Sequence, residues 1–542
     1  MLFAHGRRSR RPLLALLPAA LVAALLAPGL GSMSSAQPAP TALRPAQAVS
    51  PDRGERAEQA LAAVEAALDE KGTARAAGGA ATELTLLLRD LAVDAAALPP
   101  ADQRRARDLL ARPTSSGPDS YGNPHYGKLR NGKPRPVGRL CGENVCVHWV
   151  ETGQHKVKHD GRVKTTPAWV RRNLTELEYV HSTYVAAGYR PVLPDGAKGG
   201  DGRADIYLAN VGVAGMYGYC TTDQEIPRDG PAAVWAYCVL DNDFSRREFR
   251  TNTPLGNMKV TAAHEYFHAV QFAHDIREDG WFMEATATWA EDELYDDVND
   301  NLNYLPSSPL REPAVPLDTF AGTFQYGEWI FFRFLTERLT EAEGGMPTLV
   351  RDMWAKAAGT AENARGQYSL EAIRATLAER GVDFDEAFGA FADANRHPKD
   401  SYSEAVENSY PSAKAGRFDT QRRWFTTKLQ HLTSASKSVK PTRSSTQLKL
   451  VFDLVAPGQG AFAVVSVYPS PADGSAETQP VVLDAEGDAT LTLPFSKAEV
   501  SRVDVTLVNG STRMRCRTRG DFSCGGTPSD DRVPARFKAT IS

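Results

Sequence analysis

The chain has 542 residues, too many for one ordinary domain, and its hydrophobic content of 42% is ample for sizeable cores. Its 62 lysine and arginine residues and 66 aspartate and glutamate residues are interspersed and leave a formal charge of only −4. This balance excludes the basic surface typical of nucleic-acid-binding proteins, so we expect two or three folded units with other partners.

The first 36 residues are predicted to be a secretory signal peptide. Four arginines between residues 7 and 11 precede an apolar run, Leu13–Leu26, and small residues at Ser34–Ala36 suit cleavage by signal peptidase. The run is too short and too poorly flanked for a stable membrane anchor. We therefore expect a secreted, extracellular protein with no stable membrane insertion.

Helical periodicity marks residues 37–115. Leu61, Val64 and Leu68 recur at helical spacing, and so do the leucines between residues 84 and 91. A linker of turn-forming residues follows at Pro113–Pro118. This small helical unit is interpreted either as a propeptide or as a helical spacer, and the sequence favours neither.

Residues 116–400 have the mixed texture of an α+β domain. Strands dominate its first half and helices its second half. Strands are expected at 146–150, 206–208 and 232–240, and helices at 167–187, 260–274, 281–295 and 326–339.

The six cysteines fall into three close pairs. Export to an oxidising compartment favours disulfide bonds, and pairing between sequence neighbours is the most economical of the fifteen possible connectivities. A zinc–thiolate site is the rival interpretation, but no pair has the two-residue spacing of a zinc knuckle. The expected disulfides are Cys141–Cys146, Cys220–Cys238 and Cys516–Cys524.

The predicted helix 260–274 carries the residues of a zinc site. His264 and His268 are four residues apart, so both imidazoles project from one helix face and can bind the same ion. Catalytic zinc takes three protein ligands and leaves a further position to water. Glu265 is placed to accept a proton from that water and to deliver it to a leaving amine. A pair of surface histidines beside an incidental glutamate is the alternative.

A third ligand is expected on the next helix. Asp279 and Gly280 break the chain, which lets a second helix run back past the first. Glu284 lies in the first turn of that helix among apolar residues. A solvated acid at a helix start is the alternative interpretation, but the apolar surroundings favour a position that faces inward, toward a cation.

These residues resemble the gluzincin metallopeptidases, which include thermolysin and the membrane alanyl aminopeptidases. The resemblance rests on HExxH at residues 264–268, followed by Glu284 in the pattern WxxExxA. A closer similarity, over most of the region from Cys141 to about Leu339, is to the MXAN family of secreted bacterial metalloproteases. The resemblance implies a zincin-like α+β fold, Glu265 as general base, and the zinc ligands His264, His268 and Glu284.

The sequence departs from thermolysin-like enzymes at one position. Those enzymes place an acidic residue four positions after the third ligand to orient the first histidine, and here that position is Thr288. Glu291 or Asp292 is expected to take this role. Gluzincins also use a later tyrosine or histidine to stabilise the oxyanion, for which Tyr326 is our first candidate and His274 our second. A packing role for Tyr326 is the alternative.

Two acidic segments resemble fragments of calcium-binding loops. They are Asp201–Asp205 and Asp241–Asp243, and secreted proteases often carry calcium. Neither segment has the full ligand spacing of an EF-hand, and most such clusters are turns. Ca²⁺ is therefore a secondary cofactor expectation after Zn²⁺.

A linker is expected at residues 401–445 and a β-sandwich domain at residues 446–542. Hydrophobic residues alternate with polar ones at Leu448–Leu454, Phe462–Val467 and Val503–Leu507, with turn residues between these runs. This domain carries no visible catalytic cluster, so adhesion, substrate positioning and stability are all open roles for it.

Together these patterns predict a monomeric, secreted zinc endopeptidase that is made as a zymogen and acts on a protein or peptide substrate. An aminopeptidase is one alternative, and it would need acidic residues to hold a substrate amine. A non-catalytic extracellular binding protein with a retained structural zinc site is another. Glu265 argues against the latter because a purely structural site does not need this carboxylate.

Overall fold

The computed structural model describes residues 52–68, 84–113, 137–157, 167–227, 230–360, 362–419, 423–471, 475–516 and 522–542. The predicted signal peptide and most of the linker after Pro113 lie outside these ranges. Within them, no helix is both long enough and apolar enough to cross a bilayer. Helices and several sheets occur together, which confirms the α+β class.

A five-stranded sheet organises the region before residue 400. Across the sheet the order is β1-β2-β3-β5-β4, with β2, β3 and β5 parallel and with β1 and β4 antiparallel to their neighbours. Strand β4 therefore lies at one edge, where its outer backbone groups need partners from outside the sheet. The strands are β1 (Val137–Cys141), β2 (Val145–Val150), β3 (Ala204–Ala209), β4 (Gly218–Thr221) and β5 (Tyr237–Asp241).

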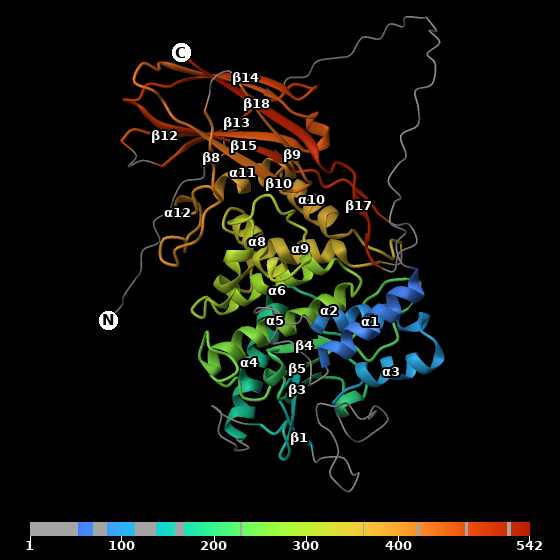
Figure 1. The fold of residues 1–542 in the computed structure, drawn as a ribbon. Coiled ribbons are helices and arrows are strands. Elements are labelled where there is room, and N and C mark those ends of the chain that lie inside the picture. The colour runs from blue at the N-terminus through green and yellow to red at the C-terminus, as the bar shows by residue number, and fades with distance from the viewer. Residues whose placement is uncertain are drawn as a thin grey trace, which may run out of the picture. The chain divides into compact units, whose positions relative to one another are not determined.

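Two groups of helices pack on this sheet (Figure 1). Helix α5 contacts β4 and β5 as well as helices α4 and α6, whereas α2 contacts β4. The first group is α4 (Pro167–Ala186), α5 (Pro254–His274) and α6 (Gly280–Leu294). The second group, called here the N-terminal helical unit, is α1 (Arg53–Leu68), α2 (Leu84–Asp94), η1 (Ala95–Ala97) and α3 (Pro100–Leu110).

The two groups cover opposite faces of the sheet. Ile206 and Leu208 of β3 belong to the core that contains α4, α5 and α6, whereas Tyr207 and Ala209 belong to the core of the N-terminal helical unit. Successive side chains of a strand face opposite sides of the sheet, and this explains the division. Parallel strands covered on both faces are largely apolar, as in β5, where every residue is buried and only the last, Asp241, is charged.

Helices continue after α6 and end near residue 401. The remaining elements before that point are η2 (Lys198–Gly200), η3 (Gly212–Ala214), η4 (Asp300–Ser307), α7 (Phe324–Gly327), α8 (Trp329–Thr336), β6 (Ala342–Glu343), β7 (Met346–Pro347), α9 (Thr348–Ala357), α10 (Ser369–Glu379), α11 (Phe384–Ala394) and α12 (Pro398–Ser401). Aromatic residues of α8 and α11 pack together, with Phe331 and Phe391 at a ring-centroid distance of 5.1 Å.

The C-terminal region forms two sheets that share one hydrophobic core. One sheet has the order β13-β12-β15-β10-β8 and the other the order β14-β11-β18-β9. The elements are β8 (Gly416–Arg417), β9 (Trp424–Leu429), β10 (Thr433–Val439), β11 (Gln447–Asp453), η5 (Pro457–Gln459), β12 (Ala461–Pro469), β13 (Glu477–Pro480), β14 (Asp488–Pro494), β15 (Val500–Asn509), β16 (Met514–Arg515), β17 (Thr527–Pro528) and β18 (Val533–Ile541).

The predicted linker at residues 401–445 is wrong for its second half. Strands β8, β9 and β10 lie within it, and each pairs with a strand of the two C-terminal sheets. Strand β10 has the sequence TSASKSV, and small hydroxyl residues such as Ser434 are buried in it. Its polar composition therefore concealed a strand that small side chains allow to pack closely.

All three expected cysteine pairs lie at disulfide distance. Cys141–Cys146 joins β1 to β2, Cys220–Cys238 joins the edge strand β4 to β5, and Cys516–Cys524 links two residues that are eight positions apart. Disulfides persist in oxidising compartments, so these bonds are consistent with an extracellular protein.

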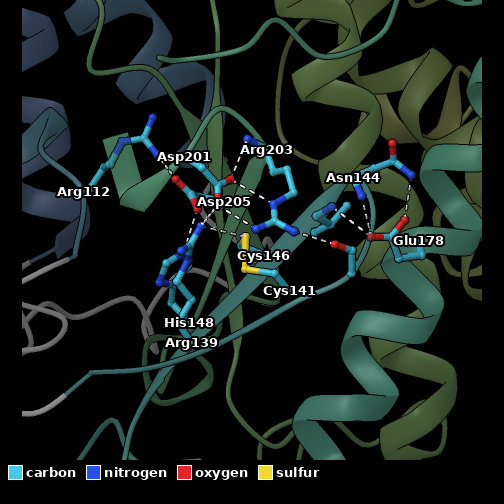
Figure 2. The surroundings of a disulfide bond; sticks show 12 residues. Arg112, Arg139, Cys141, Asn144, Cys146, His148, Glu178, Asp201, Arg203 and Asp205 are labelled. Atoms are coloured by element: carbon cyan, nitrogen blue, oxygen red, sulfur yellow. Dashed lines mark hydrogen bonds and ion pairs between the residues drawn. A yellow bond between two sulfur atoms is a disulfide. The ribbon is translucent and has the colours of Figure 1, made fainter. Parts of the chain in front are cut away.

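Arg112, just after α3, fixes the N-terminal helical unit to the sheet through a buried ion cluster. Its side chain is 0% exposed and pairs with Asp195 at 2.5 Å, with Asp223 at 2.9 Å and with Asp205. Figure 2 shows Arg112 and His148 converging on Asp205 beside the Cys141–Cys146 disulfide. A buried charge is tolerated only when it is paired, so each of these groups depends on the others.

Removal of the Arg112 charge should strongly destabilise the protein. In Arg112→Met the three carboxylates stay buried without their arginine, and we expect a loss of roughly 3–5 kcal/mol in the free energy of unfolding. Urea unfolding of the purified protein measures this quantity. Arg105→Met is the control, because Arg105 is 54% exposed in its ion pairs and such pairs contribute about 0–1 kcal/mol. Equal losses in the two variants would contradict the expectation.

Candidate metal centre

Helix α5 places its two histidines in the interior. Thr253 caps the helix by accepting a hydrogen bond from the Gly256 N–H at 3.0 Å, and Pro254 occupies the first turn, where a missing N–H costs nothing. Every residue from Val260 to His274 is buried. The helix begins six residues earlier than the apolar pattern predicts, because the cap and not the pattern fixes its start.

Three ligand atoms converge between α5 and α6. The Nε2 atoms of His264 and His268 lie 3.0 Å apart, and each lies 3.3 Å from a carboxylate oxygen of Glu284. All three side chains offer ligand atoms within 4.8 Å of one another. The structure therefore brings together the three residues that the sequence predicts as ligands.

Hydrogen bonds on the far side of each imidazole set which nitrogen faces the centre. Nδ1 of His264 lies 2.6 Å from Glu291 Oε1, and Nδ1 of His268 lies 2.7 Å from Gln271 Oε1. The Gln271 amide nitrogen donates to the Met283 carbonyl at 2.9 Å, so its oxygen is the atom that faces His268. Both Nδ1 atoms thus face a hydrogen-bond acceptor, and both Nε2 atoms face Glu284.

The Glu284 carboxylate has the surroundings of a metal ligand. It is 0% exposed, and the two imidazoles lie beside it, each with its Nε2 atom 3.3 Å from a carboxylate oxygen. Burial opposes its charge, but His268 and His264 outweigh burial and lower the pKa of Glu284 to about 2. Two imidazole nitrogens and one carboxylate form a ligand set that zinc commonly takes in catalytic sites, so these residues fit a zinc ion.

A hollow of about 530 Å³, part of it open to solvent, lies beside these ligands. Its wall combines apolar, aromatic and acidic side chains, with Gly218 of the edge strand β4 among them. The lining residues are Leu84, Met216, Tyr217, Gly218, Val260, Thr261, His264, Glu265, Glu291, Asp300, Tyr304 and Tyr326.

The predicted base, Glu265, lines this hollow. Its side chain is buried, and burial raises its pKa, with Glu284 adding to the rise while His264 and His268 oppose it. Its Oε2 atom lies 3.2 Å from the Thr85 hydroxyl, which belongs to α2 of the N-terminal helical unit. The carboxylate is therefore held from one side while it lines the hollow next to His264.

The two candidates for the oxyanion donor lie in different places. Tyr326 lines the hollow, with its ring centroid 6.1 Å from that of His264, and its ring stacks on Tyr304 at 4.8 Å. His274 lies at the other end of α5 against Trp354 and does not line the hollow. Burial lowers its pKa to about 3, which describes a neutral histidine in the core.

The candidates for orienting His264 also separate. Glu291 contacts its Nδ1, whereas Asp292 accepts a hydrogen bond from Asn301 at 2.8 Å and pairs with Arg333 at 3.3 Å. The hydroxyl of Thr288 is buried and has no hydrogen-bond partner among the described residues. Of the three, only Glu291 takes the role that the sequence left open.

Sequence reasoning missed two residues of the site, Gln271 and Thr85. Gln271 follows His268 by three positions, so its place on the same helix face was a usable signal. Thr85 is 180 positions away from Glu265, and no periodicity links residues at such a separation.

The two calcium candidates have partners already. Asp201 pairs with Arg203 at 2.7 Å, and Asp205 belongs to the Arg112 cluster, so an ion there would have to displace arginine. Asp241 accepts hydrogen bonds from the backbone N–H groups of Gly212, Asp243 and Phe244, which is the pattern of a tight turn. Asp241, Asp243 and Glu248 nevertheless lie close enough together to hold an ion.

Comparisons with known proteins add no family. No family model matches the chain, and no curated protein matches it. Among solved structures, the surface-associated copper-binding protein CorA of Methylomicrobium album BG8 is similar over 24% of this chain and 98% of its own, at 12% identity and a TM-score of 0.16.

Two further solved structures are matched over less than half of their own length. The structure of the infectious bursal disease virus Gt strain matches 22% of this chain and 32% of its own at 15% identity, with a TM-score of 0.11. The GH115 glucuronidase BtGH115A matches 54% of this chain and 42% of its own at 7% identity, with a TM-score of 0.13. Scores this low carry no conclusion about fold or function.

Proposed function

We propose that the chain is a secreted zinc endopeptidase of the gluzincin type, with a zincin-like catalytic domain. The observation that carries the proposal is the convergence of His264, His268 and Glu284 on one point beside Glu265, in the wall of an open hollow. A sheet of mixed strands with an antiparallel edge strand next to α5 agrees with the resemblance on which the proposal also draws.

His264, His268 and Glu284 would hold the zinc ion. Bound there, zinc would polarise the carbonyl of a peptide bond and lower the pKa of water. Glu291 and Gln271 hold the two imidazoles with their Nε2 atoms turned inward, so the chain supplies oriented ligands.

Glu265 carries the proton transfers. Its carboxylate takes a proton from the attacking water as the water oxygen bonds to the carbonyl carbon, and it then gives this proton to the leaving nitrogen as the carbon–nitrogen bond breaks. Burial raises the pKa of Glu265, which makes its carboxylate a stronger acceptor for the proton of the water.

Tyr326 is the proposed donor to the oxyanion, since it lines the hollow beside His264. Stacking on Tyr304 fixes the plane of its ring, and a fixed donor costs little reorganisation when the negative charge develops. His274 is no longer a candidate because it does not reach the hollow.

Replacement of Glu265 directly tests the proposed catalytic function. Glu265→Gln should bind one zinc ion per chain like the parent, yet kcat for a quenched fluorescent peptide should fall about 100- to 10,000-fold, because the proton carrier is gone. Glu312→Gln is the control, since Glu312 is exposed and should leave kcat unchanged. A parent that binds zinc but cleaves none of a diverse peptide set would instead support the non-catalytic binding protein.

A peptide substrate with a blocked N-terminus distinguishes an endopeptidase from an aminopeptidase. Asp300 is an acidic residue in the hollow that could attract a substrate amine, but its Oδ1 already accepts hydrogen bonds from Asn252 and Asn303. We therefore expect peptides with acetylated and free N-termini to be cleaved at internal bonds with similar kcat/KM, as followed by mass spectrometry. Cleavage of the free peptide alone would establish an aminopeptidase.

Zinc affinity should depend on Glu291 and not on Thr288. Glu291→Gln removes the charge that holds His264 Nδ1, and we expect the dissociation constant for zinc to rise about 10- to 100-fold. Thr288→Val has nearly the same shape, and its lost hydroxyl has no partner among the described residues, so affinity should stay the same. Competition with a chromophoric chelator measures both constants, and equal values would remove Glu291 from the site.

A further inference from the structure

The N-terminal helical unit contributes two residues to the site of the proposed protease. Leu84, the first residue of α2, lines the hollow, and Thr85 contacts Glu265. Thr85 is 1% exposed and lies between the edge strand β4 and helix α5. An interpretation of this unit as a propeptide or a spacer therefore has to account for residues inside the catalytic centre.

The Thr85 hydroxyl has a fixed orientation. It accepts a hydrogen bond from the Cys220 backbone N–H at 3.0 Å, on the outer side of the edge strand. Its single proton is then directed to Oε2 of Glu265 at 3.2 Å. One carboxylate oxygen of Glu265 is thus held by the N-terminal helical unit, and the other is left for the proton transfers.

Two further contacts bind this unit to the frame of the metal centre. Arg89 of α2 is buried and donates to the Glu278 carbonyl at 2.6 Å, in the turn that joins α5 to α6. Arg112, just after α3, pairs with Asp205 of β3 and with Asp195 and Asp223, which lie outside the strands. Among the described residues, Lys198 and His148 are the basic partners that this acidic group would keep if Arg112 left.

The sheet itself also requires the unit. Tyr207, Tyr219 and Tyr237 are at most 2% exposed, and all three belong to the core that the unit forms with the sheet. The Tyr237 hydroxyl donates to the carbonyls of Leu110 and Ala111. Departure of the unit would expose this aromatic face, and monomeric proteins rarely expose contiguous apolar surface of that kind.

We propose that the N-terminal helical unit from α2 onward, residues 84–113, is a permanent part of the catalytic domain and that Thr85 is a positioning residue for Glu265. The proposal rests on the proposed function, since it assigns Glu265 the role of proton carrier. It replaces the zymogen expectation for residues 84–113: these residues stay with the active protein, and their loss would inactivate it. If the unit were an inhibitory segment, its removal or weakening would instead raise the activity of the protein.

Full-length variants that differ in one hydroxyl group test the role of Thr85. Thr85→Val should lower kcat by about 10-fold or more with KM and zinc content unchanged, whereas Thr85→Ser should retain kcat. Thr376→Val is the control, because Thr376 is also buried and its hydroxyl has no partner among the described residues. If valine lowers the melting temperature, Thr85→Ser and Thr85→Ala replace it as the comparison, since they differ in the hydroxyl alone.

The kcat of Thr85→Val relative to that of the parent decides whether Thr85 positions Glu265. A kcat for Thr85→Val equal to that of the parent overturns the positioning role, and a higher kcat shows that Thr85 obstructs the site. A parent whose activity is lost in Glu265→Gln keeps the proposed function in either case. A parent without any activity overturns the proposed function and the role of Thr85 together.

A separate measurement tests whether residues 84–113 stay with the active protein. Native and denaturing mass spectrometry of the active, secreted protein should show that residues 84–113 are part of the active species. An active species that begins after Pro113 overturns this part of the proposal whatever the kinetics show.

Discussion

The burial of three polar side chains at one point is the constraint on which this structure depends. His264, His268 and Glu284 are all buried, with the two Nε2 atoms 3.0 Å apart and each 3.3 Å from a Glu284 oxygen, and buried polar groups are tolerated only when they are partnered. Helices α5 and α6 keep this distance because each is enclosed. Every residue of α5 from Val260 onward is buried, and the residues of α6 from Trp281 to Asp292 are buried as well. The layers around the two helices therefore hold the ligands in place.

Those layers also fix the edge strand on which the hollow is built. The Cys220–Cys238 disulfide ties β4 to β5, and Cys220 Sγ lies 2.8 Å from the Glu265 carbonyl oxygen. On the other side of the strand, the Cys220 N–H is bound by Thr85. A single residue of the edge strand is thus held by the sheet, by helix α5 and by the N-terminal helical unit. The position of Gly218, two residues earlier, follows from these three contacts.

Spacing along the sequence predicted the contacts between residues that are close to one another in the chain. His264 and His268 share a helix face because of their four-residue separation, and Glu284 reaches them because the chain turns at Asp279 and Gly280. The disulfides follow from sequence proximity in the same way. Contacts between distant segments could not be predicted, because neither the period of a helix nor that of a strand links Thr85 to Glu265.

The amino-acid composition led to wrong predictions where side chains are small or take part in ion pairs. Strand β10 appeared polar because serine, which packs closely in a strand, interrupts its hydrophobic pattern. Asp201–Asp205 resembled a cation-binding loop, and cations do bind there, but they are arginine side chains: Arg112 and Arg139 come from distant parts of the chain, and Arg203 lies within the segment. A sequence shows which residues carry charge, whereas the fold decides which charges meet.

The way the ligands are oriented bears on whether a zinc ion here would be structural or catalytic. In a structural zinc site the metal draws the ligands together, and the chain unfolds without it. Here Gln271 holds His268 and is itself held by the Met283 carbonyl, and Glu291 holds His264. These contacts hold each imidazole from the side that faces away from the point where the ligands converge. A zinc ion bound there would meet oriented ligands, and Glu265 beside the open hollow is the group that its chemistry would use.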